Sequence, residues 1–270
     1  MVRAADRAKR PARTSVWLEG KAQRRGSGRS GGQPSGLDRD RITEVTVRLL
    51  DAEGLAKFSM RRLAAELSVT AMSVYWYVDT KDDLLELALD SVFGELELPD
   101  AGGDAGAGAG GGNGAGGLGW REQLRPLAVG YRALLVRHPW VSPLIGTFLN
   151  IGPHSMAFSL CVQKVIRSTG LPPHGQMGAM SAVFQFVYGF GTIEGHFVQR
   201  CASAGMSQDD YFHQAMSTIR EEPQFAANFE NAADLMEARG GDTVEEMRER
   251  DFSFALEMLM VGIEAMVARG

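Results

Sequence analysis

The side chains that most often carry catalysis are sparse and scattered in this sequence. His154, His174, Glu194 and His196 lie in the second half of the chain, but they form no HExxH helix. The glycine-rich residues 102–119 lack the Lys and the Ser or Thr of a phosphate-binding loop. Because these residues fit no catalytic motif, we expect that the protein is not an enzyme.

The two cysteines offer no metal site. Cys161 and Cys201 form no CxxC pair, and no histidine lies at the spacing of a metal ligand. We expect both to be buried reduced thiols. The sequence therefore predicts neither a metal nor a cofactor.

The charge is divided unevenly along the chain. The net charge is −5, yet residues 1–36 carry nine basic and two acidic side chains, which is +7 and leaves −12 for the rest. The basic residues of this arm are Arg3, Arg7, Lys9, Arg10, Arg13, Lys21, Arg24, Arg25 and Arg29. Apart from Val16, Trp17 and Leu18 the arm has few apolar anchors, so we expect it to be disordered when free. Such an arm indicates an anionic partner.

The composition indicates a globular protein. With 44% hydrophobic and 23% charged residues, 270 residues suffice for one large or two modest domains. No apolar run reaches the roughly 18 residues of a membrane-spanning helix. Residues 1–36 are basic where a signal peptide would be apolar. We therefore expect a cytoplasmic protein without a membrane partner.

Apolar residues recur at helical spacing in two blocks, and strand-like alternation is absent, so the expected fold class is all-α. The blocks are residues 37–98 and 120–270, separated by a Gly- and Ala-rich flexible insertion at 99–119. Helices are expected over residues 38–53, 59–67, 70–77, 81–96, 121–137, 154–168, 176–201, 208–220, 223–239 and 243–268.

The first block contains a predicted helix-turn-helix. Ser59, Thr70 and Thr80 are of the types that cap helix N-termini. Val74 and Val78 lie four residues apart and are expected to face the core. Two short helices joined by residues 68–71 then form the motif.

The stretch from Gly54 to Leu85 closely resembles the TetR family of repressors. The resemblance covers about residues 40–95, with its hallmark at Tyr75-Trp76-Tyr77 and at Thr80-Lys81-Asp82-Asp83-Leu84-Leu85. The later Arg137-His138-Pro139-Trp140 and the final amphipathic helices are similar to the tetracycline-repressor type of C-terminal domain. The resemblance implies a homodimeric transcriptional regulator that binds a pseudo-palindromic operator in double-stranded DNA and is released by a small-molecule effector.

The resemblance also implies which residues contact DNA. It places the helix at residues 71–77 in the major groove, and a helix fits that groove with its N-terminal side chains toward the bases. The residues expected near base edges are Thr70, Ala71, Met72 and Ser73. Arg61 matches a base or phosphate contact, and Tyr75, Tyr77 and Lys81 match phosphate contacts. Trp76 is left open between packing in the core and the DNA surface.

The basic arm is a second candidate for DNA binding. Arg24, Arg25 and Arg29 are of the type that enters a narrow, negatively charged minor groove. The alternative is a solvated tail without a partner.

The second block is expected to hold the dimer interface and the effector. The dimer candidates on its two long helices are Val183, Phe184, Val187, Phe252, Leu256, Leu259, Ile263 and Met266, and the alternative is an ordinary intramolecular core. Gly189, Gly191 and Gly195 allow close approach of the backbone. The effector candidates are Phe148, His154, Met156, Phe158, Gln185, Tyr188, Glu194 and His196, a mixture that suits a sizeable apolar ligand. No His and Glu set for magnesium-tetracycline is recognised.

Two other functions stay open at this point. An effector-independent DNA-binding regulator, or an architectural DNA protein, would need only the arm, the helix-turn-helix and a dimer. A ligand-sized cavity in the second block would favour the effector-responsive regulator. An enzyme is the third and least supported alternative.

Overall fold

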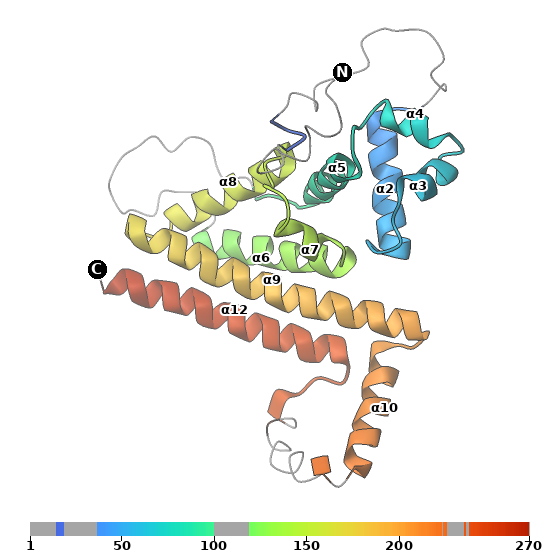
Figure 1. Ribbon diagram of the computed structural model, residues 1–270. Coiled ribbons are helices and arrows are strands. Elements are labelled where there is room, and N and C mark those ends of the chain that lie inside the picture. Colours follow the sequence, from blue (N-terminus) through green and yellow to red (C-terminus); the bar gives the residue numbers. More distant parts are fainter. Residues whose placement is uncertain are drawn as a thin grey trace. The chain divides into compact units, whose positions relative to one another are not determined.

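The computed structural model describes residues 15–18, 37–99, 119–222, 224–225, 235 and 238–269 (Figure 1). All regular secondary structure in these residues is helical, as the sequence predicts. The described residues form two compact units. Unit 1 contains residues up to Leu96 and Trp140–Ser159, and unit 2 contains Glu97–Pro139 and residues from Leu160 onward.

Unit 1 contains the predicted helix-turn-helix. Its helices are α2 (Arg39–Glu53), α3 (Met60–Glu66), α4 (Ala71–Tyr75), α5 (Lys81–Phe93), α7 (Val141–Ile145) and the beginning of α8 (Pro153–Arg167). Helix α5 packs against α2 and α7, and α3 packs against α2 and α4. The core consists of fully buried aliphatic side chains, among them Ile42, Leu50, Leu63, Val74, Leu84 and Leu89.

The helix ends in unit 1 are fixed by the predicted caps. The side chains of Ser59, Thr70 and Thr80 each accept a hydrogen bond from the backbone N–H three residues further on. At Thr80 the contact is reciprocal, because the Asp83 carboxylate accepts from the Thr80 N–H. Gly54 ends α2 with a φ of 77°, a conformation that glycine adopts without strain.

Segment 140–159 is held in unit 1 by two carboxylates. The Trp140 indole Nε1–H donates to Asp51 Oδ1 of α2 over 2.7 Å. Buried Asp90 of α5 accepts from the backbone N–H groups of His154 and Ser155, at 3.3 and 2.9 Å. Asp90 therefore supplies the negative charge at the start of α8 that a helix N-terminus favours. Residues 140–159 belong to the second block in the sequence, but they pack with the first block.

Unit 2 is built mainly from long helices. They are α6 (Trp120–Arg137), the remainder of α8, α9 (Pro173–Ala204), α10 (Gln208–Glu221) and α12 (Val244–Ala268). Helix α6 packs along α9, and α12 lies beside α9, as Figure 1 shows. The expected helix 223–239 and insertion 99–119 fall largely outside the described residues.

A buried ion pair joins the helices of unit 2. Arg132 of α6 donates two hydrogen bonds to Glu194 of α9, at 2.7 and 3.0 Å, and both side chains are buried. It donates a third to Glu249 of α12 over 2.6 Å and lies 4.5 Å from the ring centre of Phe252. Burial opposes the charge, but the hydrogen bonds to Glu194 and Glu249 raise the pKa of Arg132. The guanidinium of Arg132 can remain charged in the core because the carboxylates of Glu194 and Glu249 accept its hydrogen bonds.

Two glycines set the distance between α9 and α6. A Cβ added at Gly195 would lie 2.8 Å from the Leu135 carbonyl oxygen, and one at Gly191 would lie 3.1 Å from the Leu135 side chain. At Gly189 and Gly178 no atom lies within 4 Å of the added Cβ. Two of the three glycines predicted to allow close approach, Gly191 and Gly195, do so, and the element that they approach is α6 of the same chain.

Gly195→Ala is expected to destabilise the protein by about 1–3 kcal/mol, because the helices must separate to accept the methyl group. The matched control is Gly175→Ala on the same helix, where an added Cβ would have no atom closer than 3.8 Å and the gain in helix propensity is about 0.5–1 kcal/mol at most. Urea unfolding of both variants measures the difference. Equal stability of the two variants would contradict the close packing at Gly195.

Candidate DNA-binding site

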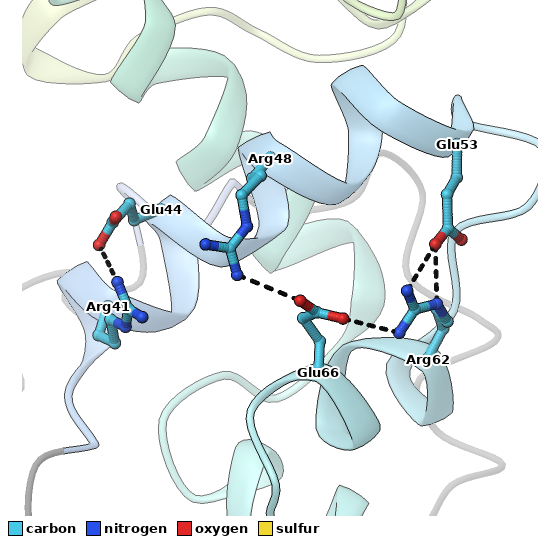
Figure 2. Close-up of polar contacts among 6 residues, drawn as sticks. All are labelled: Arg41, Glu44, Arg48, Glu53, Arg62 and Glu66. Carbon is cyan, nitrogen blue, oxygen red and sulfur yellow. Dashed lines mark hydrogen bonds and ion pairs between the residues drawn. The ribbon is translucent and has the colours of Figure 1, made fainter.

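An ion-pair network fixes α3 against α2. Arg62 of α3 lies 2.7 Å from Glu53 at the end of α2 and 3.0 Å from Glu66 one turn further on (Figure 2). Glu66 also pairs with Arg48 of α2 over 3.3 Å. The hydrogen bonds to Glu53 and Glu66 raise the pKa of the Arg62 guanidinium. Arg62 is therefore committed to holding the first helix of the motif.

Helix α4 exposes apolar side chains that the core does not use. Val74 is its one buried residue, at 0% exposure, and Val78 after it is 2% exposed. Met72 and Trp76 are 69% and 72% exposed, and Tyr75 is exposed as well. The sequence leaves open whether Trp76 packs in the core or lies on the surface. In the structure it lies on the surface, beside the residues expected near base edges.

The polar candidates lie at the start of α4. Thr70 is exposed, and its hydroxyl oxygen accepts from the Ser73 N–H. The two hydroxyl oxygens are 3.0 Å apart. Ala71 and Ser73 are half-exposed. A hydroxyl has one donor and two acceptor positions, so the pair keeps hydrogen-bonding capacity for a ligand.

The three phosphate candidates differ in their partners. The Tyr77 hydroxyl donates to the Leu37 carbonyl over 2.6 Å, while its own carbonyl accepts from Arg39 over 3.1 Å. Because a phenol has one proton to donate, donation from Tyr77 to a phosphate would have to replace the hydrogen bond to Leu37. The Lys81 amine donates to the Phe58 carbonyl over 2.8 Å and keeps two further donors. Tyr75 is exposed, so Tyr75 and Lys81 remain the phosphate candidates.

Arg61 is exposed and precedes Arg62, which forms the ion pairs described above. Within the described part of the chain its side chain forms no ion pair or hydrogen bond. The two adjacent arginines therefore have separate tasks, one inside the motif and one toward solvent. The candidates Arg24, Arg25 and Arg29 lie outside the described residues.

The expected effector residues are divided between the units. In unit 1, Phe158 packs in the core with its ring centre 5.8 Å from that of Phe93, Phe148 is half-buried, and His154 and Met156 are exposed. In unit 2, Glu194 is bound to Arg132, which corrects its expected role as a ligand contact. Tyr188 is half-buried, and Gln185 and His196 are exposed.

A hollow of about 820 Å³ lies on unit 2, and none of these candidates lines it. It is lined by Arg125, Ala238, Arg239, Arg250, Asp251, Ser253, Phe254 and Glu257. Arg239 pairs with Asp251 and Arg125 with Glu257, both over 2.6 Å. Such an ion-paired, open surface does not resemble the mostly apolar, enclosed pocket of a drug-sized ligand.

The expected dimer residues are mostly internal. Val183, Val187, Phe252, Leu256 and Ile263 are buried within one chain. This corrects the expectation that they face a second copy. The ring of Phe252 stacks on Phe186 with centres 5.5 Å apart. Phe184 and Leu259 are half-buried, and Met266 is exposed.

A capped pair of short helices, with the second presenting its side chains to solvent, defines a helix-turn-helix DNA-binding protein. Residues 42–88 match the bacterial regulatory proteins of the tetR family, and residues 113–267 match the tetracyclin repressor-like C-terminal domain. The chain therefore belongs to the TetR family and is a transcriptional regulator, not an enzyme.

Relatives support this assignment. The chain is 32% identical over 193 residues to an HTH-type transcriptional regulator of Saccharopolyspora erythraea, covering 72% of this chain and 75% of that protein. It is 31% identical over 233 residues to the HTH-type transcriptional repressor DrrR1 of Streptomyces coeruleorubidus, covering 86% and 79%. The Streptomyces coelicolor TetR family protein ActR, in complex with actinorhodin, has a TM-score of 0.62 and 26% identity over 86% of this chain and 97% of that chain.

Among the described residues, every helix is too short or too polar to span a membrane.

Arg61→Ala is expected to weaken DNA binding and to lower the log-log salt slope by about 0.9, the value of one phosphate contact. Arg62→Ala, which removes the same charge one position later, is expected to lower the thermal unfolding midpoint of the motif. Binding titrations across a salt series and thermal unfolding separate the two effects. If Arg61→Ala kept the wild-type affinity and slope, Arg61 would not contact DNA.

Proposed function

We propose that this regulator is a homodimeric repressor that binds a pseudo-palindromic operator and is released by a small-molecule effector. The observation that carries DNA binding is the exposed face of α4, where Met72, Tyr75 and Trp76 lie in solvent around buried Val74. Without a partner these large apolar side chains would remain in contact with water. In a major groove they could contact the methyl groups of thymine. That DNA binding represses transcription, and does not activate it, is supported by the relative DrrR1, which is a transcriptional repressor.

Readout by α4 rests on few polar groups. Ser73 can donate or accept at a base edge, and Met72 can contact only apolar groups. Tyr75 and Lys81 flank this face and would position the helix on phosphates without specifying sequence. The expected operator is therefore defined by few direct contacts in each half-site.

The outer faces of α9 and α12 support the dimer. Phe254, Met258 and Val261 of α12 are exposed, and exposed Gly262 and Ala265 continue the same side. The opposite side of α12 is buried in unit 2, so this helix is apolar on both sides. A helix that is apolar all round is normally buried, which a second copy would achieve.

Helix α9 has a complementary outer face. Gly178 and Gly189 leave open space where a side chain would lie, and Ala182 is exposed between them. Exposed Ile193 continues this face. Small residues allow the backbones of two helices to approach closely, so this surface suits packing against helices of a second copy.

Release by an effector is supported by the ActR structure with actinorhodin. A ligand shifts the regulator away from DNA only if it binds the released state more tightly than the DNA-bound state. Titrating actinorhodin and a small-molecule library against the DNA complex tests this part. A compound that lowers DNA affinity supports it, and a regulator that no compound releases would favour the effector-independent alternative.

Met258→Glu is expected to split the dimer while leaving the fold intact, because it places an unpaired charge in a dehydrated interface. Met177→Glu is the matched control, since Met177 is also exposed but lies on another side of α9. Sedimentation velocity reports the assembly state, and thermal unfolding reports the fold. A dimer unaffected by Met258→Glu would place the interface elsewhere.

Selection of bound sequences from random DNA is expected to yield an inverted repeat. Two recognition helices of a dimer contact half-sites about 34–36 Å, or one helical turn, apart. Ser73→Ala should change preference at matching positions of both half-sites. Enrichment of an unrepeated sequence, or of none, would contradict the homodimeric DNA-binding function.

A further inference from the structure

A short piece of the basic arm is seated on the DNA-binding unit. Residues 15–18 form a turn in which the Leu18 N–H donates to the Ser15 carbonyl over 3.0 Å. The Ser15 hydroxyl and the Val16 N–H both donate to Glu86 Oε2 of α5, each over 2.8 Å. One carboxylate oxygen thus receives two charge-assisted hydrogen bonds from adjacent residues. The turn is the short blue segment beside α5 in Figure 1.

The contact is packed as well as hydrogen-bonded. Val16 is 2% exposed, whereas Leu18 two residues later is 61% exposed. Trp17 lines a cavity together with Leu89 of α5 and with Phe148 and Asn150 of the loop between α7 and α8. This cavity has a free volume of only about 10 Å³, so the turn nearly fills the space between α5 and the loop. Because Val16 is buried, release of the turn would return an apolar side chain to water, which favours the docked state.

We propose that this turn is an anchor that holds the basic arm on the DNA-binding unit, and that Glu86 is the residue that secures it. The inference rests on the proposed DNA-binding function and deepens it. Glu86 lies five residues after Lys81 on α5, which is about 7.5 Å along the helix axis. The anchor therefore lies on the same helix as a candidate phosphate contact, about 140° around the helix axis from Lys81, and it tethers the arm's cations to the DNA-binding unit.

The anchor shortens the tether of the basic residues. Arg10 is five residues from Ser15 but 27 residues from Leu37, where the helical block begins. The local concentration of a tethered group falls with about the −3/2 power of tether length. Releasing the anchor thus lowers the local concentration of Arg10 roughly tenfold. Arg13, two residues from Ser15, gains even more from the anchor.

Two pairs of matched variants of the full chain test the anchor. Val16→Asp buries a charge in the docked turn, while Leu18→Asp adds the same charge at an exposed position of the same turn. Glu86→Ala removes the acceptor, while Glu86→Gln keeps one. With the selected operator duplex, Val16→Asp and Glu86→Ala are expected to lower affinity by up to about tenfold and to flatten its salt dependence. Leu18→Asp and Glu86→Gln are expected to remain near the wild type.

A truncation and an exchange measurement complete the test. Removing residues 1–14 keeps the turn but deletes five of the arm's cations, and it is expected to weaken binding as Val16→Asp does. Unchanged affinity after this truncation, or equal affinity of Val16→Asp and Leu18→Asp, would overturn the proposal. Amide hydrogen exchange at Val16 reports the anchor without DNA and is expected to be slow in the wild type and fast in Glu86→Ala. Fast exchange in the wild type would exclude the anchor, whereas a wild type that selects no DNA would overturn the proposed function.

Discussion

The burial of Val74 is the constraint on which the DNA-binding surface depends. A helix of five residues is too short to be stable alone, so α4 exists because Val74 and Val78 insert into the core of unit 1 and Thr70 caps its start. Buried Val74 fixes which side of α4 faces the core, and Val78, whose N–H donates to the Val74 carbonyl, continues that side beyond the helix. Met72, Tyr75 and Trp76 are then directed to solvent by exclusion. Recognition by this helix follows from the burial of Val74 in it and of Val78 just after it.

Several charged side chains around the motif also hold its helices in place. Arg62 is held by Glu53 and Glu66, and Asp90 binds the N-terminal amides of α8. These groups fix the positions of helices and leave Arg61, next to Arg62, for a partner. In unit 2 the buried Arg132 serves α6, α9 and α12 in the same way, through Glu194 and Glu249. Charged residues that look alike in the sequence thus divide into structural and exposed ones.

The sequence predicts local features of this fold well and long-range ones poorly. The caps at Ser59, Thr70 and Thr80 act within one turn, so residue types alone reveal them. Helix α12 is apolar on both sides, and no periodicity says which side faces its own chain. The pairing of Asp90 with α8, and of Tyr77 with Leu37, joins residues distant in sequence, so a single sequence carries no signal for it. Trp76 was ambiguous for the same reason, since only packing decides whether an aromatic side chain is buried.

Site-specific photo-crosslinking to the operator tests the central claim, that the exposed face of α4 contacts DNA, most directly. A photoreactive phenylalanine replaces Met72, and in a control it replaces Leu149, which is also exposed in unit 1 but lies outside the helix-turn-helix. Crosslinks are expected from position 72 to bases in both half-sites, and none are expected from position 149. Absence of crosslinks at position 72, with the DNA still bound, would contradict it.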